Sequence, residues 1–340
     1  MNLIRKLLLP FVPLYFVIVW FRNKLYDWGV KTSQSYDFPI IAVGNLSVGG
    51  TGKSPMVEYV IRLLKDRVQL ATLSRGYKRD TKGFHILTET DMAKNVGDEP
   101  LQFKKKYPNV IVAVDENRRN GIKNLRSKTL QPDVVILDDA FQHRKVKAGL
   151  YILLTTYSDL YCDDMMLPSG NLREPRQGAR RAHIIVVTKC PPDITVSERN
   201  RIIKKLQIQP DQHVFFSYID YEDQLKNNSG TNLNNELLKN QKFSLVTGIA
   251  NPKPLLAYYK ALGYNFEHLS YPDHHNFSQK DIELLQTKDC IVTTEKDYVR
   301  LVNELPDHSI WYQGIEAKFV DNHQGFDQLI LDFVQKKRGL

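Results

Sequence analysis

Short runs of consecutive apolar residues alternate with segments of helical periodicity along most of the chain. Strands of a parallel sheet show such runs because helices cover both faces of the sheet. The pattern therefore predicts an α/β fold, in which helices cover a parallel sheet. Strands are expected at residues 38–43, 69–74, 110–114, 133–139, 150–155, 183–188, 213–218, 243–247, 266–270 and 290–294.

A polar, asparagine-rich stretch at residues 220–242 interrupts this alternation. We interpret it as a surface loop or linker that divides two α/β lobes. The chain has 340 residues, which is long enough for two domains. We therefore expect a core over residues 31–220 and a smaller C-terminal α/β lobe over residues 221–340.

The first 30 residues differ in character from the rest of the chain. An apolar run of 15 residues extends from Leu7 to Phe21 and is flanked by basic residues. A membrane-spanning helix needs about 20 apolar residues, and the bulky residues that end the run do not suit a signal-peptide cleavage site. We expect the segment to lie in a membrane interface, with basic and aromatic anchors. A helix buried in an ordinary core and an uncleaved signal anchor are the alternatives.

A glycine-rich loop follows the first expected strand and precedes a helical pattern. Residues 44–54 read Gly-Asn-Leu-Ser-Val-Gly-Gly-Thr-Gly-Lys-Ser. In a phosphate-binding loop of this kind, backbone N–H groups and a helix N-terminus hold the phosphates. Lys53 is expected to reach the outer phosphates, and Ser54 to bind Mg²⁺. The residues expected to hold the nucleotide are Ser47, Val48, Gly49, Gly50, Thr51, Gly52, Lys53 and Ser54. Ser47 departs from the general motif, which has glycine there.

A strand that ends in two aspartates is the second feature that indicates a nucleotide-binding site. Four apolar residues lead into Asp138 and Asp139, as in a central strand that delivers a carboxylate to Mg²⁺. A capping or turn aspartate at a strand end is the alternative. Residues 186–190 resemble the motif with which GTPases recognise guanine, but Pro191 stands where that motif has aspartate. ATP is therefore the expected nucleotide.

Composition narrows the class of protein. The mean hydropathy of −0.38 excludes a bundle of membrane-spanning helices. Three widely spaced cysteines without a C-x-x-C pair argue against a disulfide framework or a zinc site. The formal net charge is +9, and the surplus is concentrated at residues 104–128 and 173–181. Basic patches favour phosphorylated or other polyanionic partners, although a solvated surface is the plainer interpretation.

Two further side chains are candidates for proton transfer. Phosphoryl transfer to a hydroxyl group requires a proton acceptor and a group that orients it. Asp98 precedes a helical pattern, and His274 lies in the polar cluster at residues 271–276. Taken singly, Asp98 also suits a helix cap, and the histidine cluster also suits a turn or a metal site.

Taken together, these segments resemble the tetraacyldisaccharide 4′-kinases, the lipid A 4′-kinases of Gram-negative bacteria. The resemblance covers roughly residues 38–300, and the short N-terminal segment also matches. Ser47 is the variant that this family itself carries. The matching segments, in family order, are residues 44–55, 73–77, 96–100, 114–119, 137–143, 168–174, 273–274 and 293–297.

The resemblance implies a fold and an activity. The fold would be like that of P-loop NTPases, with a second, smaller lobe that completes the active site and a membrane-associated N-terminal helix. The enzyme would use ATP and Mg²⁺ to phosphorylate the 4′-hydroxyl of a tetraacylated glucosamine disaccharide 1-phosphate, a lipid A precursor. It would work at the cytoplasmic face of the inner membrane.

The resemblance also implies roles for particular residues. Asp98 would be the catalytic base, His274 would pair with it, and Lys53 would act on the γ-phosphate. The groups around Mg²⁺ would be Ser54, Asp138 and Asp139. The residues near the nucleotide or the lipid headgroup would be Arg75, Tyr77, Glu99, Arg119, Gln142 and Arg173.

The expected partners are the lipid A disaccharide precursor and an anionic membrane surface. Neither nucleic acid nor an obligate protein partner is expected. Two other classes remain open at this stage. One is a soluble P-loop kinase or synthetase that acts on a small molecule and buries its N-terminal segment. The other is a nucleotide switch that docks on the membrane.

Overall fold

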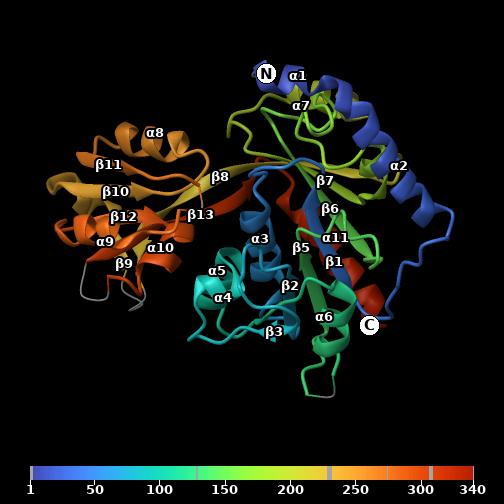
Figure 1. Cartoon of the computed structure of the whole chain (residues 1–340), viewed down its shortest axis with the longest axis horizontal. Helices are drawn as coiled ribbons and strands as arrows, with labels where there is room; N and C mark the ends of the chain where they lie inside the picture. The colour runs from blue at the N-terminus through green and yellow to red at the C-terminus, as the bar shows by residue number, and fades with distance from the viewer. Residues whose placement is uncertain (1–2, 128, 228–231, 274, 306–308, 340) are drawn as a thin grey trace.

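The structure is a computed structural model that describes residues 3–127, 129–227, 232–273, 275–305 and 309–339. Two lobes are joined by two long strands, β8 (His213–Lys226) and β13 (Ile310–Phe319), which run from one lobe into the other (Figure 1). Within the described residues, thirteen strands belong to a single sheet that continues through both lobes.

The larger lobe holds the strands that surround the glycine-rich loop. From the middle of the sheet outward, these are β7 (Ile184–Thr188), β6 (Leu150–Thr156), β1 (Ile40–Asn45), β5 (Val134–Asp138), β2 (Leu70–Ser74), β4 (Ile111–Val114) and β3 (His85–Ile86). The pairs from β7 to β4 are parallel, and the short edge strand β3 is antiparallel to β4.

The smaller lobe continues the same sheet. Strand β8 pairs in parallel with β7 and antiparallel with β13. The sheet then continues through β12 (Ile291–Thr294), β10 (Phe243–Thr247) and β11 (Phe266–Ser270), and β9 (Asn232–Asn234) pairs with β8. Helices α8 (Lys253–Ala261), α9 (Gln279–Gln286) and α10 (Glu295–Leu301) cover this part of the sheet (Figure 1).

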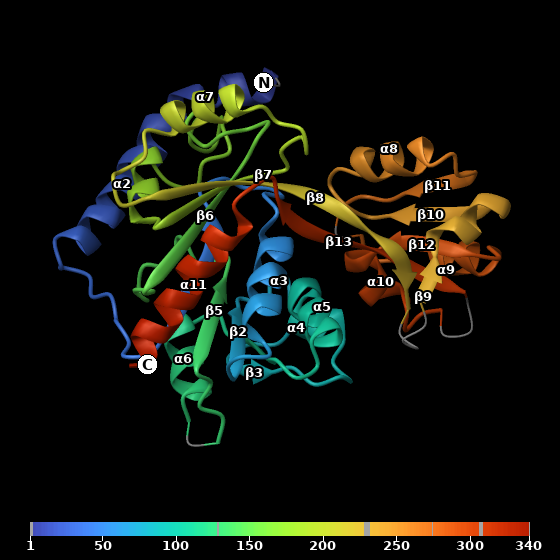
Figure 2. The same ribbon diagram turned by 180° about the vertical axis from the view of Figure 1, so that it is seen from behind.

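Helices bury both faces of the sheet in the larger lobe. One face packs against α3 (Lys53–Leu64), α5 (Asp98–Lys106) and α11 (His323–Arg338) (Figure 2). The other face packs against α6 (Arg118–Leu125), α2 (Val12–Asp27) and α7 (Val196–Leu206). The first four residues of β1 are apolar because both faces of the strand are covered: Ile41 and Val43 face the first group of helices, and Ile40 and Ala42 face α6. The remaining helical elements are α1 (Leu3–Leu7), η1 (Leu9–Phe11), α4 (Ala93–Val96), η2 (Arg176–Arg181) and η3 (Asn235–Asn240).

Each of the ten segments predicted to be a strand contains a strand, but two expectations were wrong. The sheet is mixed rather than parallel, because β3 and the β8–β13 pair are antiparallel. Residues 220–242 are not a plain loop, since β8 extends to Lys226 and is followed by β9 and η3. Antiparallel pairing with β13 satisfies the backbone of this polar strand, and Leu225 is fully buried.

The N-terminal helices lie along the outside of the larger lobe (Figure 1). Val19 of α2 is buried in the core, and the Tyr15 hydroxyl donates a hydrogen bond to the carbonyl oxygen of Arg173 at 3.1 Å. Across the described part of the chain, every helix is too short or too polar to cross a membrane. The division into residues 1–30, 31–220 and 221–340 stays a prediction. Helix α11, from the last range, packs Phe326 and Ile330 against the larger lobe.

Candidate active site

The glycine-rich loop joins the end of β1 to the start of α3. Gly49 and Gly52 have φ angles of 106° and 83°, in the left-handed region that favours glycine. The loop is also held from outside, because the Val48 N–H donates to the Asn171 carbonyl oxygen at 2.8 Å. Gly52 is the N-cap of α3, so the positive end of the helix dipole lies at the loop. This geometry suits the binding of phosphate groups.

Acidic side chains from two other elements meet the first turn of α3. The parallel register pairs Val43 of β1 with Asp138 of β5, which places the acidic strand end directly beside the loop. The Lys53 Nζ lies 3.8 Å from Asp139 Oδ1. The Ser54 hydroxyl donates to Glu99 Oε1 at 2.7 Å. The fold thus brings together the phosphate loop, the acidic strand and the start of α5.

Asp138 and Asp139 differ sharply in their surroundings. Asp138 is buried, and burial together with the nearby charges of Glu99 and Asp139 raises its pKa to about 8. Burial also disfavours the charged form of Asp139, but hydrogen bonds from Arg173 and the charge of Lys53 outweigh it and lower the pKa. Arg173 donates to both Asp139 oxygens, at 2.9 and 3.1 Å.

The acidic residues fit a Mg²⁺ ion that is bound together with ATP. Among the described residues, no group of three or more His, Cys, Asp or Glu side chains is placed to hold a metal ion. Mg²⁺ in kinases is bound by only one or two carboxylates, with phosphates and waters as the other ligands. Asp138 Oδ1 is buried and has no hydrogen-bond partner among the described residues. A divalent cation would give this oxygen a partner and would offset the mutual repulsion of Asp138, Asp139 and Glu99.

Asp98 lies where the two lobes meet. It is the first residue of α5, and Arg300 of α10 donates to both of its carboxylate oxygens, with 2.9 Å between Arg300 Nε and Asp98 Oδ1. His274, the expected partner of Asp98, lies outside the described residues. Its neighbour Asp273 forms an ion pair with Lys296 of α10 at 3.3 Å.

Most of the predicted substrate residues surround this site. Gln142 Nε2 donates to the Asn45 carbonyl oxygen at 2.7 Å and to Glu174 Oε1 at 2.8 Å, which ties the end of β1 to the segment that carries Arg173. Tyr77 is 67% exposed and follows Gly76, whose φ is 68°. A Cβ atom at Gly76 would lie 2.9 Å from the Val96 carbonyl oxygen, so this loop packs directly on the segment before Asp98.

Arg75 and Arg119 are both near the buried Arg118, the first through its charge and the second as its neighbour in the chain. Burial lowers the pKa of Arg118, and the positive charge of the exposed Arg75 side chain lowers it further. Arg119 donates to Gln34 Oε1 at 2.9 Å and lines an open hollow of about 630 Å³ beside α6. The contacts of Arg119 are therefore with the segment before β1 rather than with the phosphate loop.

Three basic residues at the site were given no role by the sequence analysis, although Arg118 lies in the matching segment 114–119. Arg118, which is 2% exposed, donates to the carbonyl oxygens of Asp115 at 2.7 Å and Asp138 at 3.1 Å. The Lys189 Nζ donates to the Gly50 carbonyl oxygen at 2.6 Å. Arg300 is the third. Lys189 belongs to the guanine-like motif, so that motif was the signal that could have found it.

Comparisons with known proteins agree with this geometry. The family model described as tetraacyldisaccharide-1-P 4′-kinase matches residues 4–335. The tetraacyldisaccharide 4′-kinase of Flavobacterium johnsoniae is 50% identical, over 99% of both chains. That of Bacteroides thetaiotaomicron is 44% identical, over 98% of this chain and 94% of its own. The crystal structure of the "apo" form of LpxK from Aquifex aeolicus in complex with ATP has a TM-score of 0.79 and 31% identity, and the match covers 98% of this chain and all of that one. The chain therefore belongs to the tetraacyldisaccharide-1-P 4′-kinase family.

Proposed function

We propose that this protein transfers the γ-phosphate of ATP to the 4′-hydroxyl of a tetraacylated glucosamine disaccharide 1-phosphate, in lipid A biosynthesis. Family membership supports the activity, the lipid substrate, and the use of ATP with Mg²⁺. One structural observation carries the proposal. Lys53 and Ser54 stand at the N-terminus of α3 and face the carboxylates of Asp139 and Glu99.

Each side chain then has a chemical role. The backbone of residues 47–52 and the side chain of Lys53 hold the outer phosphates and offset the charge of the transferring group. Ser54, Asp138 and Asp139 would hold Mg²⁺, which neutralises charge on the phosphates when it is bound. Arg173 fixes the Asp139 carboxylate. Asp98 accepts the hydroxyl proton while the sugar oxygen bonds to phosphorus and the bond to ADP breaks.

The test is transfer of labelled γ-phosphate from ATP to a purified tetraacyl disaccharide 1-phosphate. We expect a product labelled at the 4′ position, and release of ADP that depends on the lipid. If ADP release were the same without lipid, a nucleotide switch would be favoured. Efficient transfer to a water-soluble sugar but none to the lipid would favour a small-molecule kinase.

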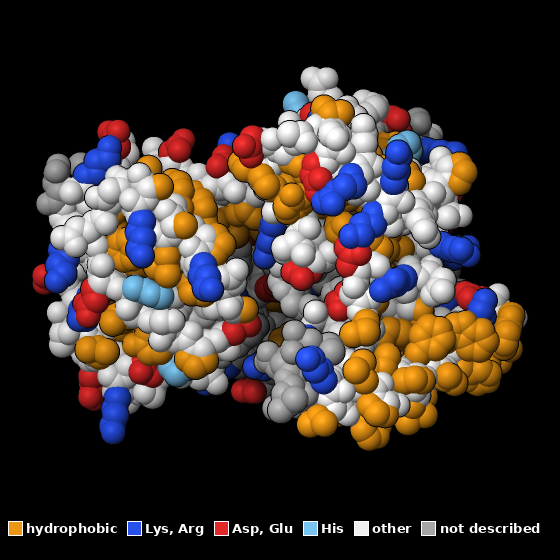
Figure 3. Space-filling model, turned by 90° about the horizontal axis from the view of Figure 1, so that it is seen from above, with side chains coloured by type: hydrophobic (Ala, Val, Ile, Leu, Met, Phe, Trp, Pro, Cys, Tyr) orange, Lys and Arg blue, Asp and Glu red, His pale blue; other side chains and the backbone are white. Residues whose placement is uncertain are grey.

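We also propose that the N-terminal helices bind the cytoplasmic surface of the inner membrane and that the enzyme is peripheral there. A hydrophobic area lies at one edge of the larger lobe (Figure 3). On α2, Leu14, Ile18 and Phe21 are 61, 58 and 50% exposed, and their spacing places them on one face of the helix. Lys24 lies over the ring of Trp20, 5.9 Å from its centroid. Apolar, aromatic and basic groups arranged in this way suit an anionic lipid interface.

Leu14→Glu should weaken vesicle binding. We expect the partition onto anionic vesicles to fall by about 10–10²-fold, because burying a leucine side chain contributes about 1.5–3 kcal/mol. Vesicle sedimentation measures this change. Leu284→Glu is the matched control, since Leu284 is 45% exposed but lies on α9 of the smaller lobe. Equal binding by both variants would contradict the interfacial role of α2.

We propose that residues 221–340 complete the active site, next to a kinase core over residues 31–220 and a membrane-surface segment over residues 1–30. The support comes from α10 in the smaller lobe. Its Arg300 forms the ion pair with Asp98 of the larger lobe. The proposed base is therefore held from across the junction between the lobes.

A further inference from the structure

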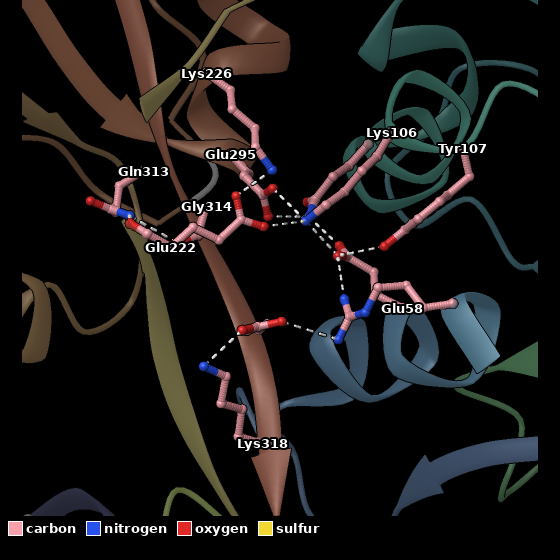
Figure 4. A network of polar contacts seen from close by, with 12 residues as sticks. Glu58, Lys106, Tyr107, Glu222, Lys226, Glu295, Gln313, Gly314 and Lys318 are labelled. Atoms are coloured by element: carbon pink, nitrogen blue, oxygen red, sulfur yellow. Dashed lines mark hydrogen bonds and ion pairs between the residues drawn. The ribbon is translucent and has the colours of Figure 1, made fainter. Parts of the chain in front are cut away.

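A cluster of charged and polar side chains lies at the junction of the two lobes, where α3, α5, α10 and β8 meet (Figure 4). It consists of Glu58, Gln102, Lys106, Glu222 and Glu295, and we call it the Lys106 cluster. The side chain of Lys106 is only 13% exposed, and Glu58 and Glu295 are 1% and 6% exposed. None of these residues takes part in the proposed chemistry.

Lys106 is the centre of the cluster. Its Nζ lies 2.6 Å from Glu58 Oε2, 2.7 Å from Glu295 Oε1 and 3.8 Å from Glu222 Oε1. These carboxylates come from α3, α10 and β8, while Lys106 is the last residue of α5. One ammonium group thus joins two helices of the larger lobe to a helix of the smaller lobe and to a strand that connects the lobes.

Gln102 completes the arrangement. Its amide donates to Glu58 Oε1 at 2.8 Å and to Glu295 Oε2 at 2.9 Å. Lys106 contacts the other oxygen of each carboxylate. Both oxygens of each buried carboxylate therefore have a partner. A buried polar network that is satisfied in this way allows one relative position of its elements, because any displacement would leave a desolvated charge without a partner.

The elements that meet here also carry the proposed site. Helix α3 begins with Lys53 and Ser54, and Glu58 is one turn beyond Ser54. Helix α5 begins with Asp98 and ends with Lys106. Helix α10 begins with Glu295 and carries Arg300, which holds Asp98. The same helices thus meet twice, once at the Lys106 cluster and once at the site.

We infer that Lys106 is a positioning residue. It fixes α10 and α5 against α3, and this keeps Asp98 in its position relative to the phosphate held by Lys53. The inference rests on the proposed function, in which Asp98 is the base. Without Lys106, the buried carboxylates of Glu58 and Glu295 would face each other without the ammonium group that they share, and only the more distant Arg62, 4.0 Å from Glu58, would offset their charge among the described ion pairs. Glu222 would keep its ion pair with Lys226. The helices would then separate, and Asp98 would lose its place relative to the phosphate loop.

Kinetics of matched variants test this role. For Lys106→Gln we expect a loss in kcat on the order of 10–10²-fold, as for a displacement of about 1 Å, with the KM for ATP within about three-fold of wild type. Lys106→Arg keeps the charge and should restore most of kcat. The matched control is Lys105→Gln, on the same helix, since Lys105 has no ion pair among the described residues.

Two further measurements separate positioning from general damage. In an Asp98→Ala background, Lys106→Gln should have almost no additional effect on kcat, because a base that is absent cannot be misplaced. Hydrogen exchange should be faster in α10 and in the first turn of α5, with the central strands unchanged.

The outcomes distinguish this inference from the proposed function. Unchanged exchange in α10, wild-type kcat in Lys106→Gln, failure of arginine to restore kcat, or full multiplicative losses with Asp98→Ala would each overturn the positioning role. A wild-type enzyme that does not phosphorylate the lipid would overturn the proposed function. The exchange measurement would still decide whether Lys106 fixes the helices, since it requires no substrate.

Discussion

Replacing Lys53 with alanine is expected to lower kcat for lipid phosphorylation by at least 10²–10³-fold, roughly the loss seen when one charge-stabilising group is removed from an active site. Lys53 is the first residue of α3, and its ammonium group reaches the acidic strand end, 3.8 Å from Asp139. Charge accumulates on the transferring phosphoryl group, and a preorganised cation there stabilises the transition state more than bound ATP.

The measurement is kcat at saturating ATP and lipid, with circular dichroism to establish that the variant is folded. Lys65→Ala is the matched control, because Lys65 follows the other end of α3 and pairs with Asp66. If the activity of Lys53→Ala were within a few-fold of wild type, the assignment of the phosphate loop would be wrong.

Asp98→Ala is expected to lower kcat by on the order of 10²–10⁴-fold, the usual contribution of a positioned base. Arg300 holds both carboxylate oxygens of Asp98, so the side chain is fixed at the start of α5. His274→Ala should lower kcat less. The double variant should be little worse than Asp98→Ala alone, because residues that act as one unit have losses that do not multiply.

The four proteins of this cycle are compared at saturating ATP and lipid. Asp66→Ala serves as the control, since Asp66 is an exposed aspartate beyond the end of α3. Fully multiplicative losses would show that Asp98 and His274 act independently. An unchanged kcat in Asp98→Ala would move the base elsewhere, and Asp139 would be the next residue to test.

The parts of the site that could be predicted from sequence are local ones. The glycine-rich loop lies between a strand and a helix that are adjacent in the chain. Asp138 is the last residue of a strand that its own apolar run predicts. Arg300 could not be predicted, because only the closeness of the two lobes brings it to Asp98, which is 202 residues away in the chain.

Two other errors have related physical causes. Residues 220–226 have the composition of a loop, yet they form the end of a strand because β13 pairs with them. The run Lys104–Lys106 has the composition of a basic surface patch. Lys106 instead lies inside the protein, since carboxylates from three distant segments surround it. Composition reports the charge of a residue but not which partners the fold will bring to it.

Helix α2 has a consequence for efforts to weaken the proposed membrane binding of this enzyme. Tyr15 bonds the backbone of Arg173, whose guanidinium holds Asp139, and Asn23 donates to the buried Glu174 at 3.2 Å. The helix therefore packs against the segment that holds Asp139, and deleting the helix would expose Arg173 and Glu174 to water. A variant with weaker membrane binding is better sought by replacing the outward-facing apolar side chains one at a time while Tyr15, Val19 and Asn23 are kept.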